Sequence, residues 1–255
     1  MPKLHTFKLG QYSGKGPRPD LAIIGDHAPA NSPFYYFPAM PELACAMNPA
    51  WSYVSWREPY VAAEWTASFV GAGTIARTTD KGLLFTSGAT DNDNNVLQHL
   101  HTFTPAANAR AAAYFRVQVS NATELDALLG FWSTDTSPVA SEPAEGAYFL
   151  KSDDGTILLG RSNDAGGTGS NTASLVAVTV AATDYDLGVV LVPTSGTVGT
   201  IQFCYKLAST TVWSRVLKTT DFPDAAVRFS MALQAGDAVA RTMNVKRFAY
   251  AAYQP

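Results

Sequence analysis

The sequence predicts an all-β protein, an antiparallel β-sandwich of the jelly-roll type that is preceded by an extended N-terminal arm. From about Glu64 onward, short segments alternate between apolar and polar residues, and turn residues separate them at the roughly 8–12-residue spacing of a sandwich. Hydrophobic residues make up 47% of the 255 residues, which is enough for a large core. Nine of the fifteen prolines fall in the first sixty residues, and this density disfavours regular helices and central strands there.

We assign residues 61–255 to one sandwich domain. Its clearest strand lies at residues 112–119, where Phe115, Val117 and Val119 share one face of the strand. Segments 147–151 and 156–161 flank a Gly-containing turn and predict a β-hairpin. Further strands are predicted at 187–192, 200–207, 211–217, 227–233 and 241–250. Together with weaker segments they give roughly twelve to fourteen strands.

Residues 121–129 allow two interpretations. Asn121 and Glu124 have the spacing of a capping box, which predicts a helix that begins at Asn121. The Gly-Phe-Trp sequence that follows at 130–132 instead favours a strand over residues 127–133. Both interpretations stay open at the level of the sequence.

The N-terminal arm, residues 1–60, combines its prolines with many aromatic side chains. An extended chain of this kind forms no core of its own, so its rings must gain stability by burial on another surface. That surface is the arm's own domain, a sister subunit or a larger assembly. Aromatic side chains dominate binding energy at protein interfaces, which makes them the candidate interface residues. These are Phe34, Tyr35, Tyr36, Phe37, Trp51, Tyr53 and Trp56.

The order of the sequence segments in the predicted sandwich domain also resembles that of a known family. The segments, within residues 64–253, are 83–88 with the Asx-rich run 91–95, then 113–119, 128–135, 148–156, 185–191 and 201–205. In this order they resemble the concanavalin A-like (laminin-G-like) jelly rolls of virion proteins from tailed bacteriophages. The turn after Tyr205 lacks the Asp-Gly pair that often occurs there in such proteins.

The resemblance implies a structural virion protein that is not an enzyme, most specifically a capsid decoration (cement) protein on the head shell. Its implied partner is the major capsid protein, bound through the arm. Assembly as a homo-oligomer, a trimer or dimer, is implied too, with assembly in the host cytoplasm and a final location on the capsid surface. The alternative is a carbohydrate-binding, lectin-like module of a tail fibre or baseplate. In that case Trp132 or Trp213, if exposed, would stack on a sugar ring.

Composition excludes other classes of partner. The chain carries 18 Lys and Arg against 21 Asp and Glu, a net charge of −3, so no basic field is expected to attract nucleic acid. No run of apolar residues is long enough to span a membrane, and the first residues lack the apolar region of an export signal. We therefore expect neither nucleic acid nor membrane as a partner.

Two clusters have the residue types of a metal site. His99 and His101 share one face of a predicted strand, but a zinc site normally needs three or four protein ligands, and only His5 and His27 remain. The Asx-rich run 91–95 does not fit a calcium-binding EF-hand loop, because Val96 takes the place of the required glycine. Asn and Asp favour turns, and this is the role we expect, with an oxygen-ligated cation as the open alternative.

No catalytic group and no cofactor is expected. Glu142 and Glu145 lie in a Pro-flanked loop without the strand motif that sandwich glycosidases carry, and no Gly-x-Ser-x-Gly elbow occurs. Cys204 alternates with aromatic residues and is expected to pack as a small hydrophobic side chain. A disulfide bond between Cys204 and Cys45 stays an alternative.

Overall fold

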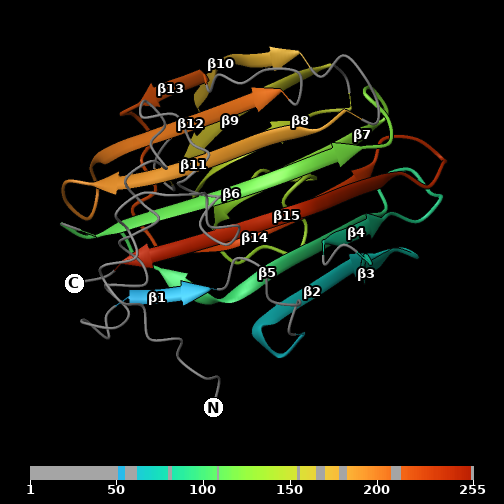
Figure 1. Cartoon of the computed structure of the whole chain (residues 1–255), viewed down its shortest axis with the longest axis horizontal. Helices are drawn as coiled ribbons and strands as arrows, with labels where there is room; N and C mark the ends of the chain where they lie inside the picture. Colours follow the sequence, from blue (N-terminus) through green and yellow to red (C-terminus); the bar gives the residue numbers. More distant parts are fainter. Residues whose placement is uncertain are drawn as a thin grey trace, which may run out of the picture.

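The computed structural model describes residues 51–54, 62–79, 82–107, 109–153, 156–164, 170–177, 183–207 and 214–253. Over this part of the chain, two antiparallel sheets pack face to face and enclose the hydrophobic core (Figure 1). The predicted antiparallel β-sandwich is thereby confirmed. Within the described residues, no helix is long and apolar enough to cross a membrane.

The first sheet has eight strands. In spatial order, seven of them are β13 (Ser214–Lys218), β12 (Gly199–Leu207), β11 (Tyr185–Pro193), β6 (Arg110–Val119), β15 (Thr242–Tyr253), β4 (Leu83–Thr86) and β3 (Thr74–Arg77). The eighth, β1 (Trp51–Val54), pairs with the C-terminal part of β15, beyond the part that pairs with β4.

The second sheet has seven strands. Their spatial order is β10 (Ser170–Ala177), β9 (Ile157–Asn163), β8 (Gly146–Lys151), β7 (Leu125–Trp132), β14 (Val227–Ala235), β5 (Asn94–Phe103) and β2 (Trp65–Val70). A short 3-10 turn, η3 (Ala62–Glu64), leads into β2. Some consecutive strands, such as β7 to β10, follow one another within one sheet, whereas others, such as β4 to β7, cross from one sheet to the other at each connection.

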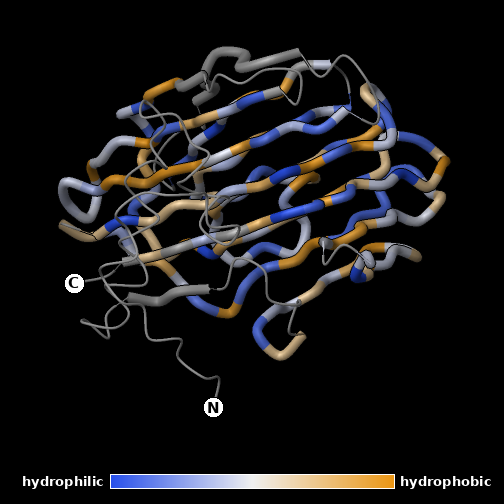
Figure 2. Tube along the Cα trace, viewed as in Figure 1, coloured by the Kyte–Doolittle hydropathy of each residue, from blue (hydrophilic) through white to orange (hydrophobic). Residues whose placement is uncertain are grey.

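Apolar and polar side chains alternate along the strands, so that each strand presents apolar side chains to the core. On β6, Phe115 and Val117 face the other sheet and are buried, whereas Arg116 and Gln118 lie on the outer face and are half-buried. Figure 2 shows the same change of hydropathy along neighbouring strands. At the centre, Phe229 of β14 stacks on Phe115 across the core, with ring centroids 5.1 Å apart. Burial of each large side chain of this kind contributes about 1.5–3 kcal/mol.

Residues 125–132 form a strand, β7, and not a helix. The oxygen Oδ1 of Asn121 does accept hydrogen bonds from the backbone N–H groups of Thr123 (2.7 Å) and Glu124 (3.0 Å), as a helix cap would. Here these bonds close a turn, and the chain continues into β7. All eight residues of β7 are buried between β8 and β14, and this burial outweighs the local capping signal.

The predicted hairpin is confirmed, and the structure contains a second hairpin between two of the other predicted strands. Strands β8 and β9 pair from Gly146 with Asn163 to Lys151 with Leu158. Strands β11 and β12 pair along their whole length, and the Thr194 N–H donates to the Val198 carbonyl at 2.8 Å to close their turn.

The predicted arm lies almost entirely outside the described residues. Of its candidate interface residues, Phe34, Tyr35, Tyr36, Phe37 and Trp56 are not described. Trp51 and Tyr53 belong to β1, whose backbone adds a strand to the eight-stranded sheet. Residues 51–54 are thus attached to the sandwich by main-chain pairing.

A segment between β7 and β8 packs on the outer face of the seven-stranded sheet. Val139 in this segment packs against an outer cluster that includes Trp132 and Tyr148, and Trp132 is 0% exposed. The Gln98 amide holds the same segment, because it donates to the Ser133 carbonyl and accepts from the Asp135 N–H. Trp132 is therefore a core residue, and the condition for stacking on a sugar, an exposed ring, is not met. Trp213 lies outside the described residues.

Candidate functional site at one end of the sandwich

Four connections meet at one end of the sandwich, on the right in Figure 1. We call this the loop end and define it as residues 71–73, 87–93, 120–124 and 236–241. Backbone hydrogen bonds tie its connections together: Ser87 N–H to the Arg241 carbonyl (2.9 Å), and Gly236 N–H to the Glu124 carbonyl (3.1 Å). The connections of the loop end therefore form one hydrogen-bonded surface and not a set of independent loops.

Asp93 is the central feature of the loop end. Its carboxylate lies between the α-carbons of Gly71 and Gly88: a Cβ atom on Gly71 would meet Oδ1 at 1.9 Å, and one on Gly88 would meet Oδ2 at 1.8 Å. Asp93 is only 7% exposed, yet its carboxylate accepts no hydrogen bond from any described residue. The carboxylate oxygens keep free acceptor capacity beside the two glycines, which a hydrogen-bond donor from outside can use.

We call the arrangement of the Asp93 carboxylate between Gly71 and Gly88 the Asp93 notch. Both glycines are required for it. Gly71 has φ +77°, a conformation that side chains other than glycine rarely adopt, and Gly88 also approaches the Ala72 nitrogen closely. The neighbouring Gly73 receives the side chain of Asn95 in the same way. The sequence Gly-Ala-Gly at 71–73 is the one local motif that could have indicated this site. The role of these glycines depends on the approach of a distant loop, which the sequence alone does not reveal.

The Asx-rich run 91–95 acts as a turn with structural side chains. Asn92 adopts φ 67°, and its Oδ1 accepts a hydrogen bond from the Gln234 amide at 2.9 Å. Asn95 donates to the carbonyls of Thr74 and Thr86, which joins β3, β4 and β5. The expected turn is present. Among the described residues, no group of three or more His, Cys, Asp or Glu side chains is arranged to hold a metal ion.

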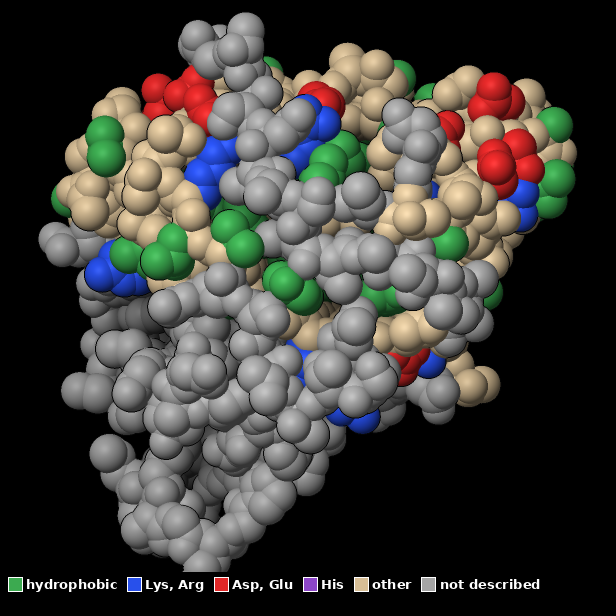
Figure 3. Space-filling model, turned by 90° about the horizontal axis from the view of Figure 1, so that it is seen from above, with side chains coloured by type: hydrophobic (Ala, Val, Ile, Leu, Met, Phe, Trp, Pro, Cys, Tyr) green, Lys and Arg blue, Asp and Glu red, His purple; other side chains and the backbone are tan. Residues whose placement is uncertain are grey.

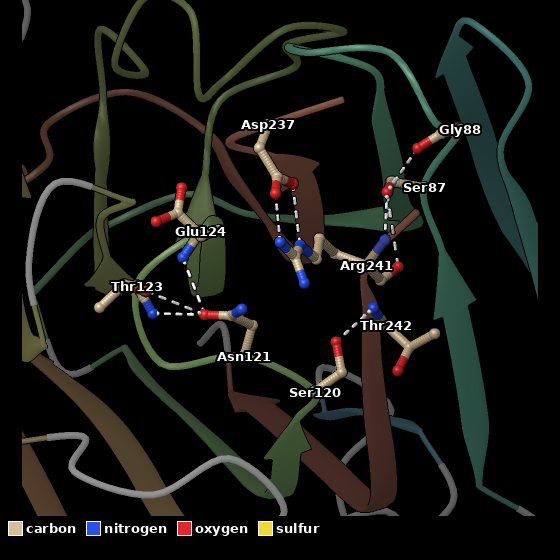
Figure 4. Close-up of polar contacts among 9 residues, drawn as sticks. All are labelled: Ser87, Gly88, Ser120, Asn121, Thr123, Glu124, Asp237, Arg241 and Thr242. Carbon is tan, nitrogen blue, oxygen red and sulfur yellow. Dashed lines mark hydrogen bonds and ion pairs between the residues drawn. The ribbon is translucent and has the colours of Figure 1, made fainter. Parts of the chain in front are cut away.

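An ion pair and a serine form the second part of the loop end (Figure 4). The Arg241 guanidinium binds the Asp237 carboxylate through two nitrogens, with Nε 2.9 Å from Oδ1. The Ser87 hydroxyl accepts from the Arg241 N–H at 2.9 Å and donates to the Gly88 carbonyl, also at 2.9 Å. This network fixes the backbone of Gly88, one wall of the Asp93 notch.

The loop end is acidic. Asp91 is exposed and Glu124 and Asp237 are half-buried, whereas Arg241 is the only cation within the defined residues. Several Asp and Glu side chains are visible at this end of the molecule in Figure 3, on the right. Such a surface favours hydrogen-bond donors and cations and disfavours anionic ligands.

A second polar cluster, on the outer face of the eight-stranded sheet, is saturated by its own contacts. The buried Asp186 accepts from the Tyr114 hydroxyl (2.6 Å), binds Arg116 through two nitrogens and lies 3.0 Å from Lys206 Nζ. Burial, reinforced by Asp186, raises the pKa of Tyr114 well above its ordinary value. Since every group has a partner, we regard the cluster as structural.

The remaining predicted chemical groups also have structural contacts. His99 is buried between Trp65 and Tyr250, in the core, and does not face solvent. Glu142 pairs with Arg161, and the Glu145 carboxylate accepts from the Asp224 N–H. Cys204 is buried, as expected, and Cys45 lies outside the described residues.

The fold is that of the concanavalin A-like, lectin-like β-sandwiches. Similar solved structures include a protein of unknown function, SO2946 from Shewanella oneidensis MR-1, with 11% identity, a TM-score of 0.55, and coverage of 80% of this chain and 86% of that one. The Lotus tetragonolobus seed lectin has 8% identity and a TM-score of 0.55, covering 80% and 100%. Lectin II from Ulex europaeus has 11% identity and a TM-score of 0.55, covering 80% and 98%. No protein-family model and no curated protein matches the chain. At these identities the likeness concerns the fold.

Proposed function

We propose that the protein is a non-catalytic binding module that recognises a carbohydrate at the loop end. The observation that carries this proposal is the Asp93 carboxylate, which is nearly buried and lacks a donor among the described residues. Sugar hydroxyl groups are neutral donors that can supply the missing hydrogen bond. A charge-assisted bond of this kind is roughly twice as strong as a bond between neutral groups.

The neighbours of Asp93 fit a ligand rich in hydroxyl groups. The Asp237–Arg241 pair and the side chains of Asn121 and Thr123 supply both acceptors and donors at the same end. The backbone bonds between the loops hold these groups in place before a ligand arrives, which lowers the entropy lost on binding. The likeness in fold to proteins described as lectins supports the same class of ligand.

A glycan array probed with the full chain tests this proposal. The matched variants are Asp93→Asn, which removes the charge at nearly constant size, and Asp91→Asn, which removes an exposed charge two residues away. We expect binding that Asp93→Asn weakens about 10–100-fold and that Asp91→Asn changes by less than about threefold, since a hydrogen bond to a charged group is worth about 1.5–3 kcal/mol. Equal binding by all three proteins, or no binding by the wild type, would contradict the proposal.

A second candidate function is a structural component of a phage virion, which the resemblance of the segments implies. The low charged fraction of 15% and the aromatic, proline-rich residues 1–50 favour this candidate, because they suit a chain whose surface is covered by neighbours. The test compares the full chain with residues 51–255, which keep β1 and its pairing with β15. We expect cofractionation with purified phage particles for the full chain and its loss for the truncated chain. Equal cofractionation would remove the role of the arm.

A further inference from the structure

Strand β11 is buried on both of its faces. All of its nine residues except Val192 are buried. Leu187 and Val189 point into the core, so the alternate residues Gly188 and Val190 point to the outer face of the eight-stranded sheet. An antiparallel sheet with one solvated face alternates between buried and exposed residues. The burial pattern of β11 therefore indicates that the outer face is covered.

Apolar side chains of the neighbouring strands share this burial. Ala112 of β6 pairs with Val190, and Cys204 of β12 pairs with Gly188. Ala112, Val190 and Cys204 point away from the core, because their neighbours in the sequence pack in it. Ala112 and Cys204 are nevertheless 0% exposed, and Val190 is 3% exposed. We call Ala112, Gly188, Val190 and Cys204 the outer patch.

The burial ends within one row of residues across the sheet. Val190 pairs with Gln202 of β12, and Gln202 pairs with Leu217 of the edge strand β13. Gln202 is half-buried, and Leu217 is 53% exposed. The eight-stranded sheet faces the viewer in Figure 1, and no described segment crosses in front of β6 and β11 there. The cover of the outer patch is therefore to be sought outside the described residues.

Residues 1–50 are the segment of the chain that fits this position. They precede β1, where Tyr53 pairs with Ala251 of β15, and Ala251 pairs in turn with Ala112 of the outer patch. With neighbouring strands about 4.8 Å apart, the patch begins about 10 Å from β1, which about three extended residues can span. Each of the other undescribed stretches has seven residues or fewer, so only residues 1–50 are long enough to cover several strands.

The composition of residues 1–50 suits the outer patch. Residues 34–37, Phe-Tyr-Tyr-Phe, are four consecutive aromatic residues, with prolines on both sides at 33 and 38. Ala112 and Gly188 are small, so aromatic rings can approach the backbone of the sheet, and each ring can bury about 150–250 Å². Proline restricts the chain before it docks, which lowers the entropy lost on docking.

We infer that residues 1–50 pack on the outer patch of their own sandwich, with the aromatic residues 34–37 over β6 and β11. A segment tethered beside the patch reaches it at an effective concentration of about a millimolar, which favours the chain's own sandwich over a second copy. The inference assigns the arm to the first of the three surfaces that the sequence leaves open, its own domain. It does not depend on the proposed carbohydrate site at the loop end.

Limited proteolysis of the full chain with chymotrypsin, which cleaves after aromatic residues, tests the inference. Val190→Asp places a charge in the outer patch, and Leu217→Asp is the matched control, since Leu217 lies in the same row of the same face but is exposed. We expect slow cleavage at residues 34–36 in the wild type, cleavage at least tenfold faster in Val190→Asp, and a change of less than twofold in Leu217→Asp. Wild-type cleavage as fast as that of Val190→Asp would overturn the inference.

The thiol of Cys204 provides a second readout that leaves the sheet unchanged. In a Cys45→Ser background, Cys204 is the only cysteine of the chain. We expect the double substitution Tyr35→Ser and Tyr36→Ser to raise the rate at which a thiol reagent modifies Cys204 at least tenfold, because loss of the rings uncovers the patch. The rate should not depend on protein concentration, since residues 1–50 cover their own sandwich. An unchanged rate in the variant, or a rate without the variant that falls as the protein concentration rises, would overturn the inference.

Discussion

The hydroxyl group of Tyr250 lies 2.6 Å from Nδ1 of His99 and joins the two sheets through the core. Tyr250 belongs to β15 of the eight-stranded sheet, and His99 belongs to β5 of the seven-stranded sheet. Nδ1 also accepts a hydrogen bond from the His101 N–H at 3.0 Å. A nitrogen that accepts from a backbone amide carries no proton, so the geometry holds His99 in its neutral form.

This contact predicts a loss of stability in mild acid. Burial, followed by the charges of His101 and Arg228, lowers the pKa of His99 from 6.5 to about 4. Below pH 6.5, His99 binds a proton in the unfolded chain but not in the folded protein. The free energy of unfolding therefore decreases as the pH falls from 6.5 toward 4. We expect a decrease of about 2 kcal/mol between pH 7.5 and pH 5, measured by urea unfolding.

His99→Gln is the control for this pH dependence. The variant is less stable at pH 7.5, but its free energy of unfolding should change less between pH 7.5 and pH 5. Glu64 faces the same region, because its charge acts on Tyr250, and Glu64→Gln separates that contribution. A pH dependence that is unchanged in His99→Gln would refute the assignment to this histidine.

The notch around Asp93 makes Gly88 sensitive to a single methyl group. We expect Gly88→Ala to lower stability by about 1–3 kcal/mol and to weaken any ligand that binds Asp93, because the added Cβ would displace the carboxylate. Gly196→Ala is the matched control, since the nearest atom to its Cβ would be 3.7 Å away. In an Asp93→Ala background the cost of Gly88→Ala should shrink. An undiminished cost in that background, measured by denaturant unfolding, would show that the strain lies elsewhere.

The buried ion cluster on the outer face of the eight-stranded sheet predicts a large effect of Asp186→Asn. The change leaves Arg116 and Lys206 without their shared carboxylate, and loss of one partner of a buried ion pair costs about 3–5 kcal/mol. Asp237→Asn breaks a pair that is more exposed, for which about 1 kcal/mol or less is expected. Chemical denaturation measures both, and equal losses would contradict the structural role of Asp186.

The substitution Trp132→Ala distinguishes a structural role of this residue from a ligand-binding role. Because its ring is buried under the connection between β7 and β8, Trp132→Ala should lower the free energy of unfolding by about 3–5 kcal/mol. At a temperature where the variant is still folded, its affinity for a ligand should equal that of the wild type. A selective loss of ligand affinity, with stability unchanged, would return Trp132 to a binding role.

The architecture could be predicted from the sequence, because it depends on local patterns. Alternation at residues 112–119 and the Gly-containing turn between β8 and β9 each predict an element without knowledge of distant residues. Residues 121–129 show the limit of this approach. Asn121 makes the expected capping bonds, but burial between two strands decides the structure that follows.

The candidate site could not be predicted, because it depends on contacts between distant segments. The Asp93 notch requires Gly71 and Gly88 to approach from two different connections. The burial of Trp132 depends on the segment between β7 and β8 that packs over the outer face of its sheet. The pattern of residues in the strand does not show whether another segment covers an aromatic side chain.

A nuclear magnetic resonance titration of the full chain with a glycan that binds it tests the carbohydrate site most directly. We expect amide shift changes that are concentrated at residues 71–73, 87–93, 120–124 and 236–241 and that disappear in Asp93→Asn. Changes confined to the outer face of either sheet, or unchanged shifts in the variant, would contradict a carbohydrate site built on Asp93.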